Sequence, residues 1–199
     1  HDVDSSVLAF EIAPIIALLV TVCILPALQF GFWLLQGSSK QSLTDPLTEL
    51  TNRRGLAVSV KRLNERAPAE ATLCALMMDL DGFKRINDTL GHAVGDEVLI
   101  RTARRIKENV REDTVVIRWG GEEFLVVDRL PEREIGLLAE RIRAAIAAPA
   151  QPTVTVSVGL ATSTSAGPDL MDVIDAADAA MYRAKASGGN RVVATRAVA

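Results

Sequence analysis

The feature that most constrains this chain is residues 115–127, VVIRWGGEEFLVV, where two apolar, β-branched runs flank a Gly-Gly pair and two glutamates. This pattern predicts a β-hairpin whose turn carries the carboxylates of Glu122 and Glu123. Gly120 and Gly121 allow positive φ angles in the turn, and because they lack a Cβ atom a ligand can lie close against the backbone. We therefore expect a turn that holds a phosphate beside a metal ion; a solvated acidic turn is the alternative.

A second acidic strand end lies earlier in the chain. Residues 72–80 form a continuous apolar run, which predicts a strand buried on both faces with Asp79 near its C-terminal end. Beside the Glu122 turn, Asp79 would complete a site for Mg²⁺, a hard cation that prefers oxygen ligands. These two sources of carboxylate indicate nucleotide chemistry.

The remaining pattern predicts an α+β fold of the ferredoxin-like type. In the order β, α, β, β, α, β, α, the expected central antiparallel hairpin meets strands that helices cover on one side. Apolar residues recur at helical spacing in the predicted helices and alternate in the predicted strand at 153–161. The expected elements are a helix at 45–66, a strand at 72–80, helices at 81–89 and 91–110, a hairpin at 114–128, a helix at 131–147, a strand at 153–161, a helix at 169–187 and an edge strand at 191–194.

Four segments resemble the successive motifs of the GGDEF family, the diguanylate cyclases. They occur in the family's order and spacing, and the resemblance covers residues 43–195. It implies a nucleotidyl-cyclase palm with a mostly antiparallel sheet flanked by helices. It also implies that two GTP molecules condense into cyclic di-GMP and two pyrophosphates across a homodimer. The segments are DPLTELTNRRGL (45–56), MDLDGFKRINDTLGHAVGDEVL (78–99), RWGGEEF (118–124) and MYRAKASGGNRV (181–192).

The resemblance also implies a metal site. In the family, two Mg²⁺-type ions per active site are held at positions that correspond to Asp79, the backbone carbonyl of Leu80, and Glu122; Mn²⁺ is an alternative metal. Glu123 would complete the acidic turn as a further ligand or as a base. Attack by a ribose 3′-hydroxyl on an α-phosphate needs an activated oxygen and neutralised phosphate charge, and a metal pair supplies both.

The substrate-binding residues follow from the same resemblance. Asn87 and Asp96 match positions that contact guanine, whereas local sequence alone favours a helix-terminus Asn and an N-cap Asp. Phe83 and Lys84 match a short loop whose amides wrap the β- and γ-phosphates. Lys185 matches a phosphate-binding lysine, although a solvated lysine in the last turn of a helix is the alternative.

Two motif positions depart from the family. In the K-x-x-G-R-N motif the arginine position holds Gly189, which lowers the expected triphosphate affinity unless Arg191 substitutes. In the R-x-x-D motif that binds product, Arg111 is present but Thr114 replaces the aspartate. We therefore expect weak or absent product inhibition.

Two alternative functions remain open. One is a non-catalytic GTP-binding regulatory module, and the other is a membrane-tethered interaction domain that uses neither metal nor nucleotide.

The N-terminal part predicts a membrane anchor. Residues 12–36 contain 25 consecutive uncharged residues, and a helix needs about 20 to cross a bilayer. Acidic residues precede this run and basic residues follow it, which places the C-terminal side in the cytoplasm. We expect an extracytoplasmic flank at 1–11, a single transmembrane helix at 12–36, a linker at 37–44 and a cyclase domain at 45–199 on the bacterial inner membrane. A buried hydrophobic helix is the alternative, and an upstream sensor outside this chain is a further expectation.

Composition excludes further classes of function. From residue 46 onward there are 21 Lys and Arg against 21 Asp and Glu, so no excess of positive charge favours nucleic acid binding. Cys23 lies in the apolar run and Cys74 on a predicted buried strand, and such different settings make them poor candidates for a disulfide. We expect neither a nucleic acid partner nor metal binding through sulfur.

Overall fold

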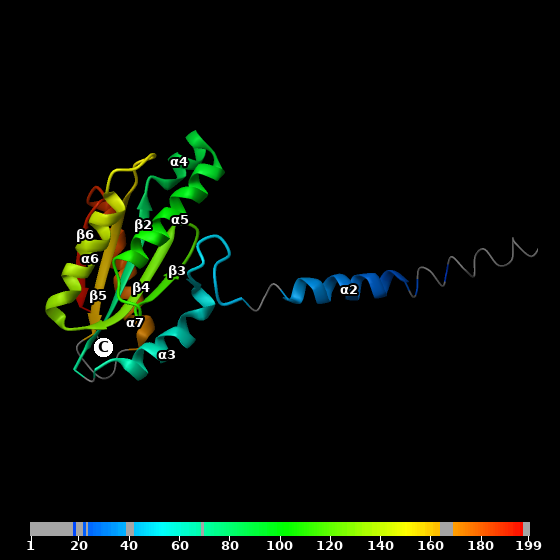
Figure 1. The fold of residues 1–199 in the computed structure, drawn as a ribbon, viewed down its shortest axis with the longest axis horizontal. Helices are drawn as coiled ribbons and strands as arrows, with labels where there is room; N and C mark the ends of the chain where they lie inside the picture. Colours follow the sequence, from blue (N-terminus) through cyan, green and yellow to red (C-terminus); the bar gives the residue numbers. More distant parts are fainter. Residues whose placement is uncertain are drawn as a thin grey trace, which may run out of the picture. The chain divides into compact units, whose positions relative to one another are not determined.

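A six-stranded sheet forms the centre of the unit Leu43–Ala199 (Figure 1). The computed structural model describes residues 18, 22, 24–38, 42–68, 70–163 and 169–196. The four inner strands pair antiparallel, whereas each edge strand pairs in parallel with its neighbour, so the sheet is mixed. The strand order is β1 (Thr51–Asn52), β3 (Val115–Arg118), β4 (Glu123–Leu130), β2 (Thr72–Asp81), β5 (Thr155–Ser163) and β6 (Val192–Arg196).

Helices cover both faces of this sheet. One face packs against α4 (Phe83–Leu90), α5 (His92–Glu108) and α6 (Glu132–Ala147), and the other against α3 (Leu56–Arg66) and α7 (Leu170–Ala186) (Figure 1). The α+β class is confirmed, but the expectation of helices on one side is wrong. The physical reason lies in β2, whose alternate side chains are apolar on both faces, so each face needs a cover.

The segment before α3 also differs from expectation. Residues 45–66 do not form one helix, because β1 and the short 3₁₀ helix η2 (Arg53–Gly55) precede α3. The side chain of Asn52 accepts hydrogen bonds from the amides of Arg54 and Gly55 at 3.0 and 3.2 Å, and this cap starts the helical region only after β1. The segment therefore reaches the sheet edge and pairs in parallel with β3.

Close packing of α7 against β5 fixes the position of the last helix. A Cβ atom on Gly159 would overlap the carbonyl oxygen of Ala177 and the amide nitrogen of Met181. Glycine therefore lets the helix backbone lie directly on the strand. Because α7 also packs on β2, the last turn of α7 brings Lys185 to the end of β2 that carries Asp79.

The unit His1–Ser42 contains α2 (Leu25–Ser38). Part of the predicted membrane span, residues 12–17, 19–21 and 23, lies outside the described residues. In the part of the chain that the structure describes, no helix combines the length and the apolar character that a membrane span requires.

Candidate active site

The acidic turn and the end of β2 lie side by side. Glu123 is opposite Asp79 in the register of β4 and β2, and the amide of Leu80 donates to the carbonyl oxygen of Glu122 at 3.3 Å. Asp79 is only 7% exposed, whereas Glu122 and Glu123 are half-buried. The antiparallel pairing therefore brings together the carboxylates that the sequence predicts at this site.

The two turn glycines serve different purposes. Gly120 and Gly121 do not have positive φ angles, so that expectation is wrong. A Cβ atom on Gly120 would overlap the carboxylate oxygen Oε2 of Glu123, whereas the Cβ position of Gly121 has no neighbouring atom within 4 Å. Gly120 thus makes room for a carboxylate of the site, and Gly121 leaves open space at which a ligand can approach the backbone.

A lysine ammonium neutralises the buried carboxylate. Lys185 Nζ lies 2.6 Å from Asp79 Oδ1 in an ion pair. Apart from this ion pair, Oδ1 has no polar partner among the described residues. A buried carboxylate oxygen with unused lone pairs is suited to bind a cation.

The environment disfavours the charged forms of all three carboxylates. Burial is the largest influence on the pKa of Asp79, and together with repulsion from Asp81 and Asp178 it leaves this pKa raised despite the ion pair with Lys185. Burial, and then repulsion from Asp79, raises the pKa values of Glu122 and Glu123. A divalent cation would relieve this repulsion, so the electrostatics are those of a cation site.

The donor set fits a hard divalent cation. Within the described ranges, no three His, Cys, Asp or Glu side chains are arranged to hold a metal ion. The expected set contains only two such side chains, those of Asp79 and Glu122, together with the carbonyl of Leu80. All three donate oxygen, and Asp79 carries the buried oxygen that lacks a hydrogen bond. Oxygen donors of this kind are those that Mg²⁺ and Mn²⁺ accept.

The predicted guanine contacts lie at the junction of α4 and α5. A Cβ atom on Gly95 would overlap Oδ1 of Asn87, so the Asn87 side chain lies against the residue that precedes Asp96. Asp96 is inside α5, which begins after Gly91, and the N-cap alternative is therefore wrong. Gly91, with φ of 86°, allows the sharp reversal that brings the two helices together.

The resemblance implied that Phe83 and Lys84 lie in a short loop. In the structure they are instead the first two residues of α4. The side chain of Phe83 is buried in the core, so only the backbone of this residue could contact a ligand. The first amides of a helix lack intrahelical acceptors and attract anions. Since α4 begins two residues after β2 ends at Asp81, these amides and the exposed Lys84 follow directly on the strand end that carries Asp79.

The turn after α7 is tied to the end of β2 by Asp81. Asp81 accepts hydrogen bonds from the hydroxyls of Thr155 and Ser157, both at 2.7 Å, and from the amide of Asn190 at 2.8 Å. Gly189 has φ of 73°, and its Cβ position is 3.0 Å from the Asp81 carboxylate. The Nε atom of Arg191 donates to the carbonyl of Gly189 at 3.1 Å, so the nearest arginine is folded over this turn.

Comparison with known proteins identifies the family. Residues 42–191 match the family model described as "Diguanylate cyclase, GGDEF domain". The chain belongs to the GGDEF family. The response regulator PleD of Caulobacter vibrioides is 37% identical over 171 residues, which cover 80% of this chain and 37% of PleD. The diguanylate cyclase DosC of Escherichia coli is 40% identical over 157 residues, which cover 74% of this chain and 34% of DosC. The chain thus spans little more than a third of the length of these relatives.

Solved structures agree with this assignment. The diguanylate cyclase SiaD from Pseudomonas aeruginosa, in complex with its activator SiaC, has a TM-score of 0.70 and 33% identity, over 96% of this chain and 76% of SiaD. The coiled coil and GGDEF domain of DgcB from Caulobacter crescentus, in complex with c-di-GMP, has a TM-score of 0.70 and 26% identity, over 94% of this chain and 100% of that chain. The fold is therefore that of the GGDEF nucleotidyl cyclases, with a mixed sheet flanked by helices.

In this GGDEF domain, Arg111 and Thr114 of the predicted product-binding motif both bind the carboxylate of Asp128. Arg111 Nη2 lies 2.6 Å from Asp128 Oδ1, and the hydroxyl of Thr114 donates to Asp128 Oδ2 at 2.6 Å. Asp128 is only 1% exposed, whereas Asp113 points to Arg66 in a separate ion pair. The positive charge of Arg111 is thus compensated by a buried carboxylate of the domain itself.

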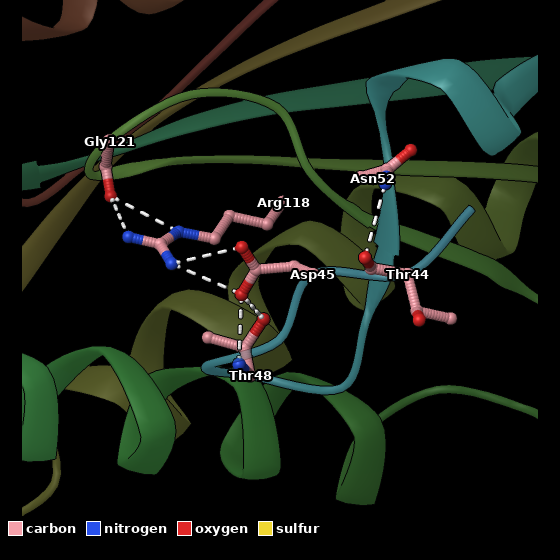
Figure 2. A network of polar contacts seen from close by, with 6 residues as sticks. All are labelled: Thr44, Asp45, Thr48, Asn52, Arg118 and Gly121. Atoms are coloured by element: carbon pink, nitrogen blue, oxygen red, sulfur yellow. Dashed lines mark hydrogen bonds and ion pairs between the residues drawn. The ribbon is translucent and has the colours of Figure 1, made fainter. Parts of the chain in front are cut away.

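Sequence reasoning missed three residues near the site of this GGDEF domain. Asp178, on α7, contributes to the raised pKa values of Asp79 and Glu123, and its signal was the seven-residue spacing from Lys185, which is two helical turns. Asp45 and Arg118 form an ion pair that reaches the glycine turn (Figure 2). No chemistry was assigned to Asp45, Asn52, Arg53 or Arg54, and only the tertiary structure shows where Asp45 acts.

Proposed function

We propose that this GGDEF domain is a diguanylate cyclase that converts two GTP molecules into cyclic di-GMP and two pyrophosphates. The observation that carries the proposal is the pairing of β2 with β4. It places the buried Asp79 opposite Glu123 and joins Leu80 to Glu122 by a backbone hydrogen bond. Diguanylate cyclases among the relatives support the same activity.

In the proposed reaction, the 3′-oxygen of one ribose forms a bond to the α-phosphorus of the other GTP. The bond from that phosphorus to the β-phosphate bridging oxygen breaks, and pyrophosphate leaves. Glu123, whose pKa is raised, accepts the hydroxyl proton in this proposal. Two divalent cations at Asp79, the Leu80 carbonyl and Glu122 would supply activation of the hydroxyl and neutralisation of phosphate charge.

The remaining residues bind and orient the nucleotide. Asn87 and Asp96 offer an amide and a carboxylate to the guanine edge, which presents both donors and an acceptor. The first amides of α4, at Phe83 and Lys84, bind phosphate oxygens together with Lys185. Open space at Gly121 lets the nucleotide approach the turn.

We infer that catalysis takes place in a homodimer. One domain binds one GTP, and the product contains two nucleotides, so two domains must face each other for both bonds to form. Activity should therefore rise with the square of protein concentration when the domains are mostly monomeric. A rate that is proportional to concentration under those conditions would contradict a dimeric reaction.

One observation favours the alternative of a GTP-binding regulatory module. Gly189 replaces the arginine of the family motif, and it lies against the Asp81 carboxylate. Turnover with GTP and Mg²⁺ decides between the two functions. We expect cyclic di-GMP from the wild-type chain and none from Glu122→Ala; binding of GTP without product in both proteins would establish the regulatory module.

We also propose that residues 12–36 attach the protein to the bacterial inner membrane in a single pass, with the catalytic domain in the cytoplasm. The supporting observations are the uncharged run and the exposed apolar side chains of α2, among them Leu25, Leu28 and Phe32 at 51%, 64% and 63% exposed. The full chain should float with liposomes in a density gradient. A variant with lysine at these three positions should remain at the bottom, and equal behaviour of both proteins would contradict attachment through this run.

A further inference from the structure

We propose that Asp45 and Arg118 are positioning residues that hold the Gly120-Gly121 turn in the geometry that catalysis requires (Figure 2). Neither residue reaches the reacting atoms in this proposal. They act through the backbone of the turn that carries Glu122 and Glu123. The inference rests on the proposed cyclase function, and it adds residues that lie outside the acidic site.

Arg118 joins two parts of the chain with one guanidinium group. Its Nη1 atom lies 3.1 Å from both carboxylate oxygens of Asp45, while Nε and Nη2 donate to the carbonyl oxygen of Gly121 at 3.3 and 2.8 Å. A guanidinium presents its donors in a rigid plane, so fixing one edge on a carboxylate also fixes the other edge. The side chains of Arg118 and Asp45 are 16% and 18% exposed, which limits screening by solvent.

Asp45 is itself held firmly. Its Oδ1 accepts hydrogen bonds from the amide of Thr48 at 2.8 Å and from the Thr48 hydroxyl at 2.7 Å, and its own amide donates to the carbonyl of Leu50 at 2.7 Å. Burial alone would raise the pKa of Asp45, but the hydrogen bonds from Thr48 and Arg118 outweigh it and leave the pKa lowered. At neutral pH this side chain is therefore an ionised and rigid anchor for Arg118.

The glycine turn depends on this anchor because of how its carbonyls are bound. The carbonyl of Glu122 accepts from the amide of Leu80, and that of Glu123 accepts from the amides of Trp119 and Gly120. The carbonyl of Gly121 accepts instead from the Arg118 side chain. No atom lies within 4 Å of the Gly121 Cβ position, so packing does not restrain this residue on that side, whereas the Arg118 hydrogen bonds hold its carbonyl.

The segment that carries Asp45 makes two further contacts with the hairpin, at Arg118 of β3 and at Trp119, which follows this strand. Asn52 is opposite Arg118 in the parallel pairing of β1 with β3. The guanidinium of Arg53 lies 4.4 Å from the centroid of the Trp119 ring, within the range of a cation–π contact. Residues 45–53 thus pack along β3, the strand that leads into the turn. Arg118 links this segment to Gly121 because its guanidinium binds both Asp45 and the carbonyl of Gly121.

Two variants of the full chain test the proposal. Asp45→Asn keeps the shape and the bonds from Thr48 but removes the charge, and Arg118→Lys keeps the charge but not the planar fork. We expect kcat for cyclic di-GMP formation to fall about 10- to 100-fold, with KM for GTP changed by less than about threefold, because misplacement of catalytic groups lowers the rate of the chemical step. The matched control is Glu132→Gln, which removes the carboxylate of an exposed ion pair, also at 3.1 Å, with Arg196.

Amide hydrogen exchange without substrate provides a readout that does not require activity. In Asp45→Asn and Arg118→Lys we expect faster exchange at residues 119–123 and unchanged exchange in β2 and β5; Glu132→Gln should match the wild type. Unchanged exchange at the turn, or a normal kcat despite faster exchange, would overturn the proposal. If the wild-type chain makes no cyclic di-GMP, the proposed function fails. Amide hydrogen exchange alone then decides whether Asp45 and Arg118 hold the Gly120-Gly121 turn. Should Arg118→Lys not fold, Asp45→Asn decides.

Discussion

Lys185 and Asp79 are joined by an ion pair across 2.6 Å, between the last turn of α7 and the end of the central strand. Without substrate or metal, the ammonium supplies the positive charge that the buried carboxylate requires. In the proposed reaction, the same ammonium would bind a phosphate of GTP, and a divalent cation would neutralise Asp79 in its place. The acidic site can therefore remain folded before its ligands arrive.

Lys185→Met should lower the free energy of unfolding at pH 7 in metal-free buffer by about 1–2 kcal/mol, because removing one partner of a largely buried pair leaves the other charge uncompensated. Lys185 is partly exposed, which keeps the effect below that of a fully buried pair. Urea denaturation measures it. As the pH falls through the raised pKa of Asp79, that carboxyl becomes neutral and the deficit should disappear. A deficit that is the same at acidic pH would contradict this reading; Lys84→Met, at an exposed position, is the control.

Glu123→Gln should make the metal-free protein more stable at pH 7, while it abolishes cyclase activity. The pKa of Glu123 is raised by burial and by Asp79, so the folded state binds this proton more tightly than the unfolded chain. The free energy of unfolding of the wild type therefore falls as the pH rises from the pKa of Glu123 in the unfolded chain to its higher pKa in the folded protein. The uncharged glutamine side chain of the variant avoids this loss. The gain is on the order of 1 kcal/mol or less because the side chain is partly exposed. Thermal unfolding in EDTA at pH 7 and at acidic pH measures it, and a less stable variant at pH 7 would contradict the electrostatic account.

The sequence was sufficient for the features that depend on local pattern. The apolar run ending at Asp79 and the β-branched runs around Gly120-Gly121 predicted the two strand ends that the structure pairs.

The sequence was insufficient where a side chain contacts residues far from it in the chain. Asp45 and Arg118 are 73 residues apart, and no local rule links them. The segment 45–55 was predicted as helix because its start resembles a helix N-terminus, yet pairing with β3 and the Asn52 cap determine its structure. Local sequence alone favoured a helix cap as the alternative role of Asp96, but α5 begins four residues earlier.

Gly95→Ala should impair guanine recognition. The new methyl group would overlap Oδ1 of Asn87 and displace that amide from its place beside Asp96. We expect KM for GTP to rise about tenfold or more, which corresponds to loss of one good hydrogen bond to the base, with a smaller change in kcat. Gly136→Ala on α6 is the matched control, since its Cβ position has no neighbour within 4 Å. Steady-state kinetics with GTP would show an unchanged KM if Asn87 plays no part in binding the base.

Cyclic di-GMP should inhibit this protein weakly or not at all through the Arg111 region. Arg111 and Thr114 both bind the buried Asp128, so a nucleotide would have to compete with an internal carboxylate for the arginine. Titration of cyclic di-GMP into the catalytic assay measures the inhibition. Arg111→Ala should give the same titration curve as the wild type. A low-micromolar inhibition constant that this substitution abolishes would show that the arginine is available to product.

The central claim is that Asp79, Glu122 and Glu123 form a working cyclase site, and product analysis of the full chain incubated with GTP and Mg²⁺ tests it most directly. We predict cyclic di-GMP and pyrophosphate in a ratio of one to two from the wild type, separated by liquid chromatography and identified by mass. Glu122→Ala should yield neither, although it should fold and still bind guanine nucleotide. A wild-type chain that binds GTP and forms no more cyclic di-GMP than Glu122→Ala would contradict the account.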